Sequence, residues 1–132
     1  MISEQVIRQL LIDSCHSSKE AESLILSNLA SDEFIALLVR IAIDEDDYEG
    51  DAPMQAAYYL SKAPPELLKL FELQLLSLLT TANGFGGHVA LTLGRMHSRQ
   101  AEPIIRSELG DGKFPSAWLY EEALKNYVPP NA

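Results

Sequence analysis

Hydrophobic residues recur at spacings of three and four along most of the chain, the period of an amphipathic α-helix. The pattern is clearest in residues 6–11, 24–29 and 34–41. No comparable stretch alternates with the period of two that marks a strand. The sequence therefore predicts an all-α protein of about eight helices joined by short turns.

Residues typical of helix ends fall between these segments. Ser17 and Glu20 have the spacing of a capping box, so we expect a helix to begin there. Proline is tolerated in the first turn of a helix, and three prolines should each mark a helix start: Pro53, Pro65 and Pro103. Gly110-Asp111-Gly112 should end the helix that contains Pro103. The glycine-rich residues 83–87 should form a loop.

One helical unit recurs with a period of 33 residues. Ala57, Ala90 and Ala123 are spaced at this interval, and each is followed by large apolar residues. A small residue beside large ones lets two helices approach closely and interlock. The copy at Ala123 is degraded, because Asn126 replaces the leucine found three residues after the other two alanines. The period predicts a stack of helical hairpins, and a chance coincidence in an irregular bundle is the alternative.

The stretch at residues 88–109 resembles a short HEAT-like repeat of the bilin-lyase type. The matching residues are Ala90, Leu93, Gly94, Ala101 and Pro103. The resemblance implies a short right-handed solenoid of three to four units, formed by residues 1–132 as a single domain. The chain has no His-Glu dipeptide, so the paired metal-binding motifs of HEAT-like hydroxylases are missing.

The segment 67–79 is apolar on most of its faces. A helix of that kind is typical of the interior. We therefore expect one helix over these residues, buried among its neighbours.

Charge is distributed unevenly along the chain. The formal net charge is -9, and residues 1–66 account for all of it, with four basic and thirteen acidic residues. Such a field repels nucleic acid and anionic membranes and attracts cationic partners. The single cysteine, Cys15, excludes an internal disulfide, and it flanks an apolar run, which favours a buried thiol. With no basic N-terminal stretch leading into an uninterrupted apolar one, we expect a cytoplasmic protein.

The acidic segment, residues 44–51, holds six acids in eight residues. A calcium loop would place Gly50 at position six, but position twelve is then Ala56 instead of a glutamate. A solvated loop at a helix start is the second interpretation. The third is a docking surface, because dense unpaired acids repel one another and a cationic partner would relieve that repulsion. The predicted partner-binding residues are Asp44, Glu45, Asp46, Asp47, Tyr48, Glu49 and Asp51, with Tyr48 as an aromatic anchor.

Other candidate chemistry is weak. The histidines His16, His88 and His97 lack metal-ligand spacing, and surface or capping roles are expected for all three. Residues 84–88 are similar to a phosphate-binding loop, but no Lys-Ser or Lys-Thr follows them, so a turn is expected. A small basic patch is expected from His97 and three arginines: Arg95, Arg99 and Arg106.

These observations favour stoichiometric protein binding over catalysis, with no cofactor and no metal. In size, charge and helical content the chain resembles bacterial immunity proteins of contact-dependent growth inhibition systems. That resemblance implies a monomer that forms a 1:1 complex with a cationic nuclease toxin, an RNase, and occludes its active site. A HEAT-like enzyme or lyase domain with a small-molecule site is one alternative, and a generic protein–protein adaptor is another.

Overall fold

The computed structural model describes residues 3–44, 51–81, 86–110 and 117–127. The described residues are helical, with short turns and no strand, which confirms the all-α class. The helices are α1 (Glu4–Cys15), α2 (Lys19–Ser27), α3 (Asp32–Ala42), α4 (Asp51–Leu60), α5 (Pro65–Leu68), α6 (Glu72–Thr81), α7 (Gly86–Arg95), α8 (Ala101–Gly110) and α9 (Ala117–Leu124), with 3₁₀ turns at Lys69–Phe71 and Lys125–Tyr127.

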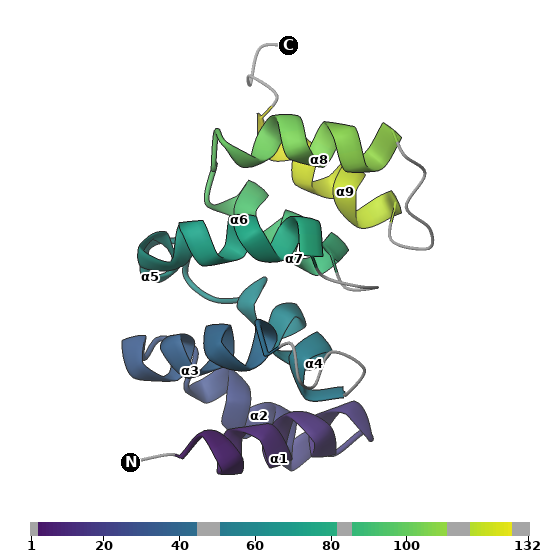
Figure 1. The fold of residues 1–132 in the computed structure, drawn as a ribbon. Helices are drawn as coiled ribbons and strands as arrows, with labels where there is room; N and C mark the ends of the chain where they lie inside the picture. Colours follow the sequence, from purple (N-terminus) through teal and green to yellow (C-terminus); the bar gives the residue numbers. More distant parts are fainter. Residues whose placement is uncertain (1–2, 45–50, 82–85, 111–116, 128–132) are drawn as a thin grey trace.

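The helices pack in pairs, and the pairs follow one another in chain order (Figure 1). The pairs are α1 with α2, α3 with α4, α6 with α7, and α8 with α9. The most extensive contacts between pairs run along one row of helices, from α1 to α4, from α4 to α7 and from α7 to α9. The N-terminal pair therefore lies at one end of the stack and the α8–α9 pair at the other (Figure 1). The right-handed sense and the kinship with HEAT-like repeats stay predictions.

A serine caps each of the first three helices. Ser3 Oγ accepts a hydrogen bond from the Val6 amide at 3.2 Å, and Ser18 and Ser31 cap α2 and α3 in the same way. The expected cap at Ser17 is wrong by one residue. Ser17 has a φ of 74°, whereas an N-cap needs extended backbone, which Ser18 has.

The three alanines of the 33-residue period lie along the contacting row. Ala57, Ala90 and Ala123 are buried on α4, α7 and α9 respectively. One continuous hydrophobic cluster runs from Ile7 of α1 to Ala123 of α9. The row of small residues lets these helices approach closely while their leucines fill the space between them.

The helix expected over residues 67–79 is wrong in two respects. The chain forms α5, a 3₁₀ turn and α6 instead of one α-helix. Leu70 and Leu73 are 81% and 75% exposed, while Leu75 on the same segment is buried. The neighbouring helices α3 and α7 cover only one side of this segment, and an apolar pattern cannot specify how many of its faces find a neighbour.

Candidate functional site

The acidic segment connects α3 to α4, and the structure describes its two ends. Asp44 follows the last turn of α3, where its amide donates to the Ile41 carbonyl at 3.2 Å. Asp51 is the first residue of α4. The other residues predicted to bind a partner lie outside the described residues: Glu45, Asp46, Asp47, Tyr48 and Glu49.

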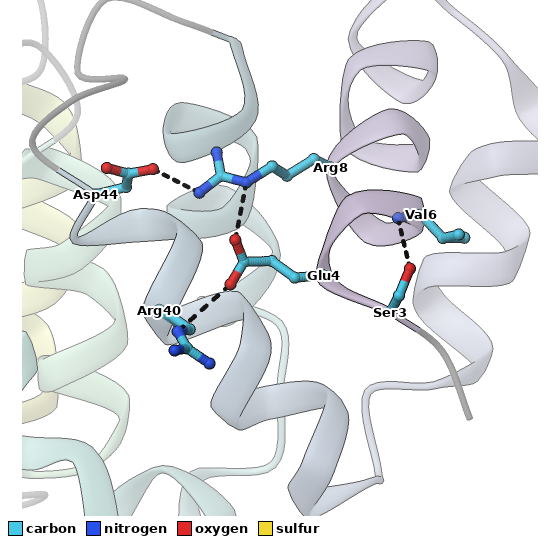
Figure 2. A network of polar contacts seen from close by, with 6 residues as sticks. All are labelled: Ser3, Glu4, Val6, Arg8, Arg40 and Asp44. Atoms are coloured by element: carbon cyan, nitrogen blue, oxygen red, sulfur yellow. Dashed lines mark hydrogen bonds and ion pairs between the residues drawn. The ribbon is translucent and has the colours of Figure 1, made fainter.

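Asp44 is tied to α1 by an arginine. Arg8 Nη2 lies 2.6 Å from Asp44 Oδ2, and Arg8 Nε lies 3.2 Å from Glu4 Oε2 (Figure 2). Arg40 of α3 approaches the other oxygen of Glu4 at 3.4 Å. Two arginines and two carboxylates therefore form one polar network between α1 and α3, and it fixes the start of the acidic segment against α1.

The far end of the segment also lies beside α1. Asp51 Oδ2 is 3.7 Å from Nε2 of His16, which follows the last residue of α1. This pair is exposed and attractive only when the imidazole is protonated. The interpretation of the acidic segment as a set of unpaired charges is therefore wrong for Asp44, which pairs with Arg8, whereas Asp51 has only an imidazole beside it.

Three other acids of the N-terminal half have no such partner among the described residues. Glu20 lies in the first turn of α2, and Asp32 and Glu33 lie in the first turn of α3. All three are exposed, and none makes an ion pair within the described part of the chain. The positive end of each helix dipole stabilises them locally. From the sequence alone, these acids contributed only to the total charge, because nothing in their spacing indicates that they share a surface.

The sequence did not predict the group of aromatic and basic side chains that lies where α4 contacts α7. His88 lies in the first turn of α7 and is half-buried. Its ring centroid is 5.5 Å from that of Tyr58 on α4, and Lys62 Nζ is 4.9 Å from the same Tyr58 ring. Burial lowers the pKa of His88, and the charge of Lys62 lowers it further. The i, i+4 spacing of Tyr58 and Lys62 was visible in the sequence, but the contact with α7 was not.

The glycine-rich stretch does not form the expected open turn throughout. Gly86 and Gly87 are buried in the first turn of α7, while residues 83–85 lie outside the described residues. A Cβ atom on Gly86 would lie 2.5 Å from the Tyr120 hydroxyl oxygen. Close packing against α9 therefore explains this glycine without a phosphate ligand.

Most side chains of the expected basic patch make hydrogen bonds or ion pairs within the protein. The Arg95 guanidinium donates to the carbonyl of Ser61, which follows α4. Arg106 pairs with Glu102 at 2.8 Å on the same helix. His97 Nδ1 lies 3.2 Å from the Asn126 carbonyl oxygen, whereas Arg99 is exposed. Two of the three arginines are thus committed to contacts inside the chain.

The described part of the chain contains no group of three or more His, Cys, Asp or Glu side chains placed to hold a metal ion. Ala56, which the calcium-loop alignment placed at the bidentate position, is buried in α4. Cys15 is half-buried rather than fully buried as expected.

None of the helices in the described ranges is both long and apolar enough to span a membrane. In comparisons with known proteins, the chain matches no family model, no curated protein and no solved structure.

Proposed function

We propose that this chain is a protein-binding module whose acidic N-terminal half docks a cationic protein. The more specific proposal is an immunity protein that neutralises a cationic nuclease toxin in a 1:1 complex. Nuclease active sites bind phosphates through basic side chains, so an acidic surface can occupy the same groups. A small-molecule enzyme or lyase domain and a generic adaptor remain the alternatives.

The observation that carries the proposal is the position of the charge. The net charge of -9 belongs to residues 1–66, and the described part of these residues builds α1 to α4 at one end of the stack (Figure 1). Exposed acids on α2 and α3 extend the negative surface beyond the acidic segment. Charge of one sign gathered at one end of a molecule steers oppositely charged partners toward that end.

Stacked helices suit this task physically. Each pair contacts only its neighbours, so a stack presents an extended surface without needing a cavity. The network of Arg8, Glu4 and Asp44 fixes the start of the acidic segment in place. Fixing charges before a partner arrives reduces the entropy lost on binding.

The first test is co-purification of the tagged chain with the product of the adjacent gene, followed by an assay of that product for nuclease activity. An inhibited nuclease in a 1:1 complex is the expected result. A partner with neither nuclease activity nor a basic surface would contradict the specific proposal and favour an adaptor.

The second test compares two variants of equal net charge. One carries amide substitutions at the six acids of the acidic segment: Asp44, Glu45, Asp46, Asp47, Glu49 and Asp51. The control carries amides at six other acids of the same half: Asp13, Glu20, Glu22, Asp32, Glu33 and Glu66. Association should slow in both variants, because both lose long-range attraction, which salt screens.

Only the segment variant should also dissociate faster from the partner. If one desolvated ion pair is broken, the dissociation rate should rise by the factor that corresponds to about 2 kcal/mol or more. Binding is measured at two salt concentrations, together with protection of cells that express the toxin. If the segment variant binds and protects as well as the parent, the segment is a solvated loop and the interface lies elsewhere.

A further inference from the structure

The contact between α4 and α7 joins the first two helix pairs to the last two, and it contains a histidine. His88 of α7 is half-buried there, with its ring nearly perpendicular to that of Tyr58, at an interplanar angle of 79°. Lys62, one turn after Tyr58 on α4, places its Nζ 4.9 Å from the centroid of the same ring. The Lys62 ammonium group and the titratable imidazole of His88 therefore both contact the Tyr58 ring.

Among the described residues, the other helices around the first turn of α7 place no carboxylate in an ion pair with His88. From α9, the Tyr120 hydroxyl lies against Gly86, and burial and the charge of Glu108 on α8 raise the pKa of Tyr120. From α6, the nearest atom to Gly86 is the Leu79 carbonyl oxygen. Glu72, the one acid of α6, accepts a hydrogen bond from Ser98.

We propose that His88 makes the α4–α7 junction sensitive to pH. Protonation places a second cation beside Lys62, in a half-buried position and against a ring that Lys62 already contacts. Removing a charged imidazolium from water is unfavourable without a carboxylate partner. Acidification therefore weakens the contact between the two halves of the stack, whichever partner the protein binds.

The direction of the effect follows from the protonation equilibrium. The pKa of His88 is lower in the folded chain than the usual value of about 6.5, which applies to the unfolded chain. The unfolded state then binds the proton more readily. His88 makes its full contribution to stability above the unfolded pKa. This contribution decreases as the pH falls below the unfolded pKa, and the loss is complete once the pH is below the folded pKa.

The test combines a direct titration with a stability measurement. NMR of the imidazole resonances follows His88 protonation in the intact chain, and urea unfolding from pH 7.5 to pH 5 gives the folding constant. Each unit by which the measured His88 pKa falls below its unfolded value should appear as a tenfold loss in the folding constant once the pH is below the folded pKa. His88→Gln should remove that part of the loss, whereas His97→Gln, a change at an exposed turn, should follow the parent.

Two further variants assign the cause. Lys62→Met should raise the measured pKa of His88 and reduce the loss on acidification. His88→Phe keeps an aromatic ring against Tyr58 and tests the effect if His88→Gln does not fold. Hydrogen exchange at pH 5, corrected for intrinsic rates, should show lower protection in α4 and α7 for the parent than for His88→Phe.

The proposal is overturned if His88 titrates at or above about 6.5. It is also overturned if the parent and both His88 variants lose stability equally between pH 7.5 and pH 5. If His88 titrates low but Lys62→Met leaves its pKa unchanged, the role assigned to Lys62 is wrong.

Discussion

Gly94 of α7 lies so close to Ala123 of α9 that a Cβ atom at position 94 would be 2.7 Å from the Ala123 carbonyl oxygen and 3.1 Å from its Cα. The obstruction is backbone, which cannot move aside as a flexible side chain can. Gly94 belongs to the repeat motif, and Ala123 belongs to the row of alanines spaced by 33 residues. The close approach of two helices therefore explains why both positions hold small residues.

Replacing Gly94 with alanine should destabilise the protein. The added methyl group must push α7 away from α9, and overpacking of this kind typically costs about 1 to 3 kcal/mol. The better helix propensity of alanine, about 1 kcal/mol, offsets part of that cost. Urea unfolding of Gly94→Ala measures the net loss. Gly110→Ala is the control, because a Cβ atom there meets nothing within 4 Å, and it should leave stability unchanged or slightly higher.

Ala90 gives a second test of the repeat register. It is fully buried on α7, so leucine at this position should overpack the interior and cost about 1 to 3 kcal/mol. The midpoint of thermal unfolding should fall for Ala90→Leu. The same change at the exposed Ala30 serves as the control and should shift the midpoint little. An unchanged midpoint for Ala90→Leu would contradict the register, though not the helical fold.

Tyr127 links the last 3₁₀ turn to the end of α7. Its hydroxyl donates to the Ser98 carbonyl oxygen at 2.7 Å. Ser98 is itself buried, and its hydroxyl donates to Glu72 Oε2 at 2.5 Å. Tyr127→Phe removes the hydroxyl that makes this bond and a longer one, at 3.4 Å, to the Leu93 carbonyl oxygen of α7, and should cost about 0.5 to 1.5 kcal/mol near pH 7. An unfolding free energy equal to that of the parent would show that these bonds contribute nothing net.

Tyr127 should also make the stability of the protein depend on pH in the alkaline range. Burial first, then the charges of Glu102 and Glu72, raise the pKa of Tyr127 to about 12. The folded chain therefore holds the phenol proton more tightly than the unfolded chain, whose tyrosine titrates near 10. Stability from Tyr127 is complete below pH 10 and lost as the pH rises toward 12. Unfolding curves across this range should fall more steeply for the parent than for Tyr127→Phe. Parallel curves would contradict the prediction.

Arg8 and Arg40 form a matched pair for testing the network at the acidic segment. The Arg8 side chain is 22% exposed and pairs with both Glu4 and Asp44, whereas that of Arg40 is 73% exposed and pairs with Glu4. We expect Arg8→Gln to cost about 1 to 2 kcal/mol, because it removes charge-assisted hydrogen bonds from a partly buried site. Arg40→Gln should cost only about 0 to 1 kcal/mol, as exposed ion pairs usually do. Equal losses in the two variants would show that Arg8 has no special role.

The leucines of the 3₁₀ turn at Lys69–Phe71 and of α6 should differ sharply in their contribution to stability. Leu70 and Leu73 are mostly exposed, so Leu70→Ser and Leu73→Ser should change the unfolding free energy by no more than about 0.5 kcal/mol. Leu75→Ala should cost about 2 to 5 kcal/mol, because Leu75 is 1% exposed and its truncation leaves a cavity. A large loss from Leu70→Ser would restore the expectation that this segment is buried.

The local pattern of the sequence determined much of this protein. Hydrophobic spacing gave the helical class, because one face of each helix must be covered by a neighbour. Proline indicated the starts of α4, α5 and α8, because its fixed φ and missing N–H suit the first turn of a helix, and Gly110 indicated the end of α8, because glycine readily adopts the conformations found at helix ends. The 33-residue spacing found Ala57, Ala90 and Ala123, all of which are buried along the contacting row. The concentration of acids in the first half is also a property of the sequence alone.

Only the tertiary structure decided which side chains meet across helices. Arg8 and Asp44 are 36 residues apart and His88 and Tyr58 are 30 apart, so no local period relates the members of either pair. Leu70 and Leu75 have the same chemistry, but one faces solvent and the other the core, because α3 and α7 cover a single side of their segment. Short-range patterns fix backbone conformation, whereas burial, ion pairing and shifted pKa values depend on neighbours that the chain brings together only on folding.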